Sequence, residues 1–123
     1  MTDELTLTEW LKSTQKQRDE LRAYGRSPLP LDAGQRHVEL DKSIQNSDDA
    51  GRLRADAEEF LVKEIAAAYM RIRGNDLKLR VPEIEAQVES DVRAIKRIVQ
   101  DCAVTDRTLK TRIFAIQNQS RSR

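Results

Sequence analysis

Apolar residues recur at steps of three and four positions over most of this chain, which is the spacing of one face of a helix. The clearest run starts beside Pro82, a residue that suits the first turn of a helix because no N–H is needed there. Its members are Val81, Ile84, Val88, Val92, Ile95, Ile98, Val99 and Cys102. We predict a helix over residues 82–102.

A second run precedes it and predicts a helix over residues 49–73 that ends at Gly74. Its apolar members are Leu53, Ala57, Phe60, Leu61, Ile65, Ala68 and Ile72. Within it, the small residues Ala66–Ala68 would let a neighbouring helix approach closely. We expect this helix to pair with residues 82–102 as a central antiparallel pair, because the eight residues between them are enough to return the chain.

It is open whether residues 33–73 form one helix or two. Asn46–Asp49 offers several side chains that cap helix N-termini, which favours a break and a separate helix over 33–46. A first helix is expected from Thr6 or Thr8 to about Ala23. We expect Gly25 to end it in a left-handed conformation.

A further helix is expected to begin at Thr105 or Asp106, before a frayed basic tail over residues 118–123. Only residues 77–81 alternate between apolar and polar, and a lone strand has no partner, so they are interpreted as an extended linker. The predicted fold is all-α, a small bundle of four to five helices. It forms one domain over residues 1–123, with an N-terminal helix and proline-containing loop (1–32) and a helical core (33–117).

Composition removes most enzyme classes. The 123 residues include one cysteine, Cys102, and one histidine, His37, and the four glycines are isolated, so neither a soft-metal centre nor a phosphate-binding loop is indicated. No apolar run approaches the roughly 20 residues of a membrane span. We expect a cytoplasmic protein that is not an enzyme. It is expected to use no cofactor or metal, to bind no membrane and to have no small-molecule substrate.

The charge is unevenly distributed. Residues 1–92 carry 14 lysines and arginines against 19 aspartates and glutamates, a net charge of −5, whereas residues 93–123 carry 8 against 2, a net charge of +6. A basic end attracts an acidic partner, which is a nucleic acid, an anionic protein surface or the acidic part of another copy.

The segment 98–113 resembles a helix-turn-helix, with a small residue, Ala103, at the turn and a capping Thr105 before a basic helix. In this interpretation Arg107, Lys110, Thr111 and Arg112 face DNA. Ala103 stands where glycine is usual, and an apolar residue is expected in place of Arg112. An ordinary helical hairpin is therefore favoured.

Near the other end, Trp10 and Leu11 are candidate partner-binding residues, because a tryptophan near a terminus often inserts into a partner. Burial of Trp10 in the core of the chain itself is the favoured alternative. The leading hypothesis is a non-enzymatic interaction or assembly module that binds a protein partner or a second copy through helix faces. The alternative is a nucleic-acid-binding regulator that uses residues 98–117.

Overall fold

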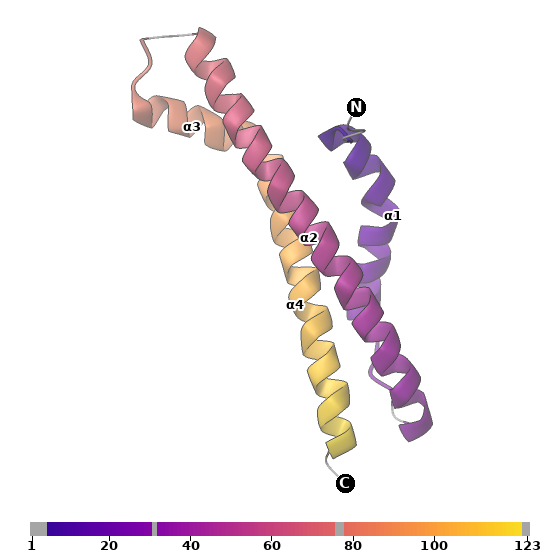
Figure 1. The fold of residues 1–123 in the computed structure, drawn as a ribbon. Coiled ribbons are helices and arrows are strands. Elements are labelled where there is room, and N and C mark those ends of the chain that lie inside the picture. The colour runs from indigo at the N-terminus through magenta and orange to yellow at the C-terminus, as the bar shows by residue number, and fades with distance from the viewer. Residues whose placement is uncertain (1–4, 31, 76–77, 122–123) are drawn as a thin grey trace.

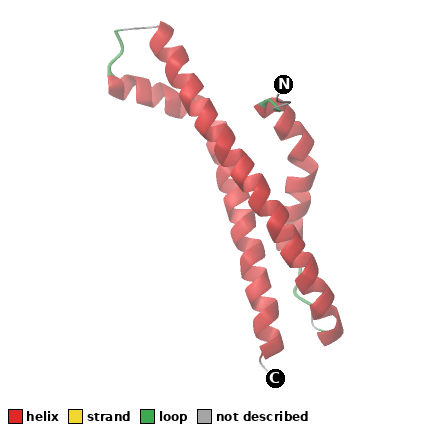
Figure 2. Ribbon diagram, viewed as in Figure 1, coloured by secondary structure: helices red, strands yellow, loops and turns green. Residues whose placement is uncertain are grey.

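The computed structural model describes residues 5–30, 32–75 and 78–121, and within these ranges every regular element is a helix. The helices are α1 (Leu7–Gly25), α2 (Ala33–Asn75), α3 (Val81–Asp91) and α4 (Arg93–Arg121). Two long helices, α2 and α4, lie along each other, α1 runs beside α2, and α3 lies at the far end of α2 (Figure 1). Short loops join the helices, and the all-α prediction is confirmed (Figure 2).

Helix α1 begins as its sequence predicts. The Thr6 hydroxyl accepts a hydrogen bond from the Glu9 N–H at 3.2 Å, which satisfies one of the free donors of the first turn. The prediction of a left-handed Gly25 is wrong, because no described glycine has a positive φ. A glycine is favoured there by close approach: a Cβ on Gly25 would lie 3.1 Å from Thr108 Cγ2 of α4.

The predicted break at residues 46–49 is also wrong, because α2 continues through it as one helix. The potential cap residues have other roles. Ser47 is buried on the inner face, together with Ser43 and Ala50, while Asp49 pairs with Arg52 one turn further on. The small residues of this inner face let the neighbouring helices pack closely against α2, and this packing outweighs the local preference for a cap.

The predicted helix 82–102 is interrupted at Val92, so the antiparallel pair of 49–73 with 82–102 is not confirmed as such. Val92 has backbone angles of −98° and 5°, and the chain changes direction there (Figure 1). The bend keeps Val88, Val92 and Ile95 in the same apolar cluster. Because the apolar spacing continues across the bend, the sequence pattern does not reveal it.

Helix α4 is continuous through the predicted turn at Ala103 and the predicted start of a fifth helix. The Thr105 hydroxyl donates to the Asp101 carbonyl four residues earlier, at 3.0 Å, and so does not cap a new helix. Residues 118–121, predicted as part of a frayed tail, continue the helix, and 122–123 lie outside the described residues. The predicted linker becomes non-helical backbone at residues 78–80, with Val81 opening α3 and Leu77 outside the described residues.

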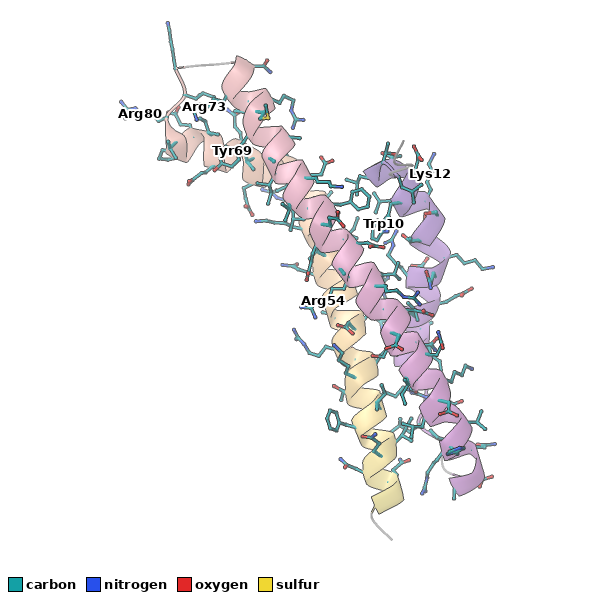
Figure 3. The ribbon with its side chains drawn as sticks, viewed as in Figure 1. Trp10, Lys12, Arg54, Tyr69, Arg73 and Arg80 are labelled. Atoms are coloured by element: carbon teal, nitrogen blue, oxygen red, sulfur yellow. The ribbon has the colours of Figure 1, made fainter. Side chains whose placement is uncertain are left out.

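Contacts between α2 and α4 run in opposite order along the two helices. From one end to the other they join Arg36 with Gln119, Glu39 with Arg112, and Arg54 with Asp106. The labelled side chains in Figure 3 show how Trp10 of α1 and Tyr69 near the end of α2 lie at different levels of this assembly. None of the described helices combines the length and apolar character needed to cross a membrane.

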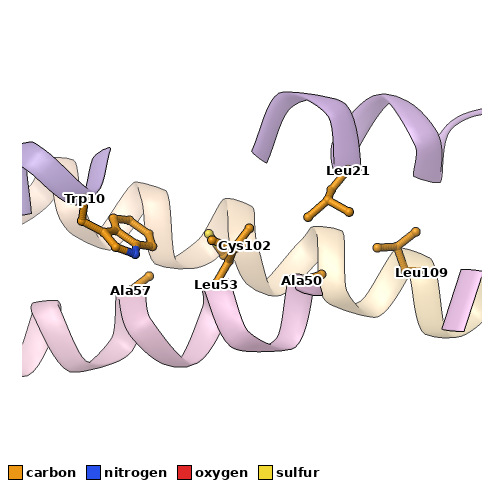
Figure 4. Close-up of a cluster of buried hydrophobic side chains, with 7 residues drawn as sticks. All are labelled: Trp10, Leu21, Ala50, Leu53, Ala57, Cys102 and Leu109. Atoms are coloured by element: carbon orange, nitrogen blue, oxygen red, sulfur yellow. The ribbon is translucent and has the colours of Figure 1, made fainter. Parts of the chain in front are cut away.

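Buried apolar side chains form two clusters. The first joins α1, α2 and α4 and contains Trp10, Leu21, Ala50, Leu53, Ala57, Cys102 and Leu109 (Figure 4). The second joins α2, α3 and the start of α4 and contains Ala68, Ile72, Ile84, Val88, Val92 and Ile95. Leu7, Phe60, Ile98 and Val99 are partly buried and pack against both clusters.

Candidate functional site

The two candidate partner-binding residues lie on the inner side of α1. Trp10 is 3% exposed and its ring lies 5.5 Å from that of Phe60, with the Arg18 guanidinium 5.7 Å from the indole. Leu11 is half-buried and packs against the first cluster. In this structure Trp10 is therefore a core residue. Its use as a docking anchor stays a prediction that requires α1 to move away from α2.

The four candidate DNA-contacting residues do not form one surface. Arg107 and Thr111 are exposed, but Lys110 pairs with the buried Asp106 at 3.2 Å and Arg112 is 5% exposed. Both the helix-turn-helix interpretation and the favoured helical hairpin are wrong, since α4 is one continuous helix through this segment. Arg112 is not on the surface because its side chain points toward α2, where partners from distant parts of the chain satisfy its charge.

Arg112 is the centre of a polar network that fastens the loop after α1. Its Nη1 donates to the Ser27 carbonyl at 2.7 Å, and its Nη2 donates to the Pro28 carbonyl at 3.2 Å and to Glu39 Oε2 at 3.4 Å. The guanidinium carbon lies 4.7 Å from the centre of the Tyr24 ring, in the range of a cation–π contact. This network links α1, α2, α4 and the loop at one end of the molecule.

Tyr24 and Glu39 complete the network and shift each other's titration. The Tyr24 hydroxyl donates to Glu39 Oε2 at 2.7 Å and lies 3.0 Å from Ser43 Oγ. The hydrogen bond from Tyr24, followed by that from Arg112, lowers the pKa of Glu39 despite partial desolvation. Burial is the main cause that raises the pKa of Tyr24. The network thus holds an ionised carboxylate beside a neutral phenol.

A second polar link joins the middle of α2 to α4. The Asp106 side chain is 3% exposed, and its Oδ2 accepts from Arg54 and Lys110, both at 3.2 Å. Arg54 and Lys110 remain partly in solvent, so the buried carboxylate is neutralised from the rim of the helix pair. Lys110 is thus held to a carboxylate of its own helix while its side chain stays 62% exposed.

A depression between α1 and α4 is lined by several cationic side chains. The α1–α4 groove is lined by residues at the end of α1, in the loop after it and on α4, among them Arg22, Gly25, Arg26, Ser27, Leu29, Val104, Arg107, Thr108, Thr111 and Arg112. It consists of adjoining hollows of about 120 and 340 Å³. Arg26 and Arg107 are exposed and make no ion pair with the described residues, whereas Arg22 lies 3.9 Å from Asp19. Asp101 is the single acidic residue that lines the groove.

The groove contains three of the four residues selected from the sequence, Arg107, Thr111 and the largely buried Arg112, and two arginines that were missed. Arg22 and Arg26 follow Arg18 at steps of four, so the three share one helical face, which is a signal the sequence contains. This spacing indicates a binding surface only because α4 lies beside that face of α1, which the sequence does not show. The guanidinium and hydroxyl donors that line the groove can bind a negatively charged group.

Neither a metal centre nor a reactive thiol is part of this site. Among residues 5–30, 32–75 and 78–121, no three histidine, cysteine, aspartate or glutamate side chains come together in a metal-binding group. Cys102 is buried in the first cluster, and this burial raises the pKa of its thiol.

The fold places the chain among all-α proteins built on a pair of long helices. No protein-family model matches it, and neither a curated protein nor a solved structure does so.

Proposed function

We propose that the protein is a non-enzymatic helical interaction module and that the α1–α4 groove binds an acidic segment of a partner protein. The observation that carries this proposal is the presence of two exposed arginines without an ion pair among the described residues, Arg26 in one hollow of the groove and Arg107 in the adjoining one. Guanidinium groups that lack an internal partner are free to form bidentate contacts with carboxylates.

The lining between the two arginines favours a peptide over a bare anion. Val104 is 56% exposed, and Gly25 and the half-buried Leu29 add apolar surface beside Thr108. An acidic segment with an apolar residue between its carboxylates would bury that surface while its charges meet the arginines. Asp101 at the edge of the groove would repel a continuous run of negative charge, which favours a partner with spaced carboxylates.

A nucleic acid is the second candidate, because Arg93 and Arg97 extend the row of exposed cations along α4. These two residues also make no ion pair with the described part of the chain. Phosphate binding would use Arg93, Arg97 and Arg107 together, whereas peptide binding in the groove would use Arg26 and Arg107.

Peptide selection tests the proposal directly. The purified chain is used to select from a library of random displayed peptides, and the selected peptides are synthesised and titrated against the protein by fluorescence anisotropy. We expect enrichment of aspartate and glutamate around an apolar residue. Binding should be lost in Arg26→Ala and Arg107→Ala and retained in the matched control Arg97→Ala, an exposed arginine of α4 outside the groove.

The same titration with a short DNA duplex measures the alternative. Nucleic-acid binding would weaken with a log-log salt slope of about −0.9 for each phosphate neutralised, and Arg97→Ala would weaken it as much as Arg107→Ala. Peptides without acidic enrichment, or peptides that bind Arg26→Ala and Arg107→Ala as tightly as the original chain, would refute the groove as a protein-binding site.

A further inference from the structure

A second exposed surface follows the outer face of α2, far from the α1–α4 groove. We define the α2 stripe as Glu59, Val62, Ala66, Met70 and Arg73, which recur at steps of three and four and therefore share one face of the helix. Val62 is 67% exposed and Met70 is 78% exposed, and the other three residues are exposed as well. Two large apolar side chains on one uncovered helix face offer apolar surface that a partner can bury.

The other helices leave the α2 stripe uncovered because they pack on the opposite side of α2. Ala68, 1% exposed, is in the cluster with α3 and the start of α4, while Ala57 faces α1 and α4. Two positions along a helix turn the side chain by about 200°, so a buried Ala68 directs Ala66 outward. Of the three consecutive alanines, therefore, one serves the contact within the chain and Ala66 remains for a contact outside it.

The residues of the α2 stripe are spaced symmetrically about Ala66, and the charged residues at its two ends have opposite sign. Val62 and Met70 lie four residues before and after Ala66, and Glu59 and Arg73 lie seven residues before and after it. An antiparallel copy of α2 centred on Ala66 would set Val62 against the other copy's Met70, and Glu59 against the other copy's Arg73. A twofold axis makes each of these pairs twice and closes the assembly at two copies.

We propose that the α2 stripe is the interface of an antiparallel homodimer with Ala66 at its twofold axis. The small side chain of Ala66 at the crossing point permits close approach of the two helix backbones, so that Val62 and Met70 meet across the interface. This inference concerns a different surface from the α1–α4 groove and does not depend on the function proposed for it.

Charge complementarity is what selects a second copy as the occupant. Arg73 makes no ion pair with the described residues, and it lies at the end of α2 near Tyr69 (Figure 3). Glu59 contacts Lys63 at 3.5 Å, but both side chains are at least half exposed, and such an exposed pair on one helix is weak. Glu59 is therefore free to bind the other copy's Arg73 at little cost.

Sedimentation velocity of the full chain over a range of concentrations tests the proposal. Ala66→Arg sets two arginines against each other at the axis and should weaken dimerisation by about 100-fold or more. Ala67→Arg is the matched control: the same substitution at an exposed alanine of the same helix, turned away from the α2 stripe. It should leave the dimer unchanged, and circular dichroism should show the same helix content in both variants.

A charge swap distinguishes the antiparallel geometry from any other use of this surface. Glu59→Arg and Arg73→Glu should each weaken the dimer, because each sets like charges opposite one another, and the double variant should restore it. A chain that stays monomeric up to about 1 mM, an Ala66→Arg variant that dimerises like Ala67→Arg, or a double variant no better than the singles would overturn the proposal. Peptide binding in the α1–α4 groove would be unaffected by any of these outcomes.

Discussion

Replacing Arg112 by alanine is the substitution whose effect follows most directly from the structure. The side chain is 4% exposed and provides three hydrogen bonds: to the carbonyls of Ser27 and Pro28 and to the carboxylate of Glu39. Alanine would leave two loop carbonyls without these donors. It would also remove the cation that faces Glu39 and the ring of Tyr24.

The expected loss is about 3–5 kcal/mol of the free energy of unfolding. Hydrogen bonds to a charged group contribute roughly 1.5–3 kcal/mol each, and removing one member of a buried ion pair costs about 3–5 kcal/mol in all because its partners are left unsatisfied. The total stability of a domain this size is typically about 5–15 kcal/mol, so the loss is a large share of it. Arg112→Lys should cost roughly half as much, because a lysine keeps the charge but lacks the fork that reaches the loop and Glu39 together.

Urea denaturation followed by circular dichroism at neutral pH measures the loss. Arg107→Ala is the control, since it removes an exposed arginine of the same helix that makes no ion pair with the described residues, and it should change stability by less than about 0.5 kcal/mol. In a double-mutant cycle, Arg112→Ala and Glu39→Gln should show a coupling of about 0.5–3 kcal/mol. A loss below about 1 kcal/mol for Arg112→Ala, or one equal to that of Arg107→Ala, would refute the network as a stabilising feature.

Three further predictions concern Glu39, Asp106 and Cys102. Because the hydrogen bond from Tyr24 lowers the pKa of Glu39 in the folded chain, the stabilisation it provides is complete above the ordinary carboxyl pKa and is lost as the pH falls through the lowered value. Urea midpoints between about pH 7 and pH 3 should therefore fall more steeply for the original chain than for Glu39→Gln, and parallel curves would contradict this. Asp106→Asn should cost about 1.5–3 kcal/mol in the same urea assay, because the buried carboxylate loses its charge opposite two cations; an unchanged midpoint would show that those ion pairs contribute nothing. Cys102 should react with iodoacetamide at least about 100-fold more slowly in the folded chain than in urea, since burial both shields the thiol and raises its pKa, and comparable rates would mean that the first cluster opens readily.

Much of the fold could be predicted because its helices are amphipathic. The apolar spacing located the second half of α2 and most of α3, and Thr6 marked the start of α1. The bend at Val92 could not be predicted, since a three-and-four spacing is the same on a straight helix and on two helices that turn toward one cluster. The continuity of α2 through Ser47 depends on small residues being covered by neighbours, which local capping preferences do not contain.

The candidate site was only partly predictable because charge does not determine exposure. Arg107 and Arg112 have the same chemistry and lie on the same helix, but one is on the surface and the other is buried by carbonyls from a loop more than 80 residues earlier in the chain. Arg22 joins Arg107 only because α1 ends beside α4. In both cases the missing information is the relative placement of helices.

The side chains shared by the two apolar clusters have a consequence for how the molecule loses its structure. Both clusters are contacted by the same four partly buried side chains, those of Leu7, Phe60, Ile98 and Val99. The two clusters therefore share part of their packing. If the two clusters were separate, an assembly of long helices could unfold from either end independently of the other. Here the loss of the second cluster also withdraws contacts from Phe60, whose ring in turn lies against that of Trp10. Loss of order at one end is therefore transmitted to the other, and the cooperativity of the whole chain depends on these four side chains.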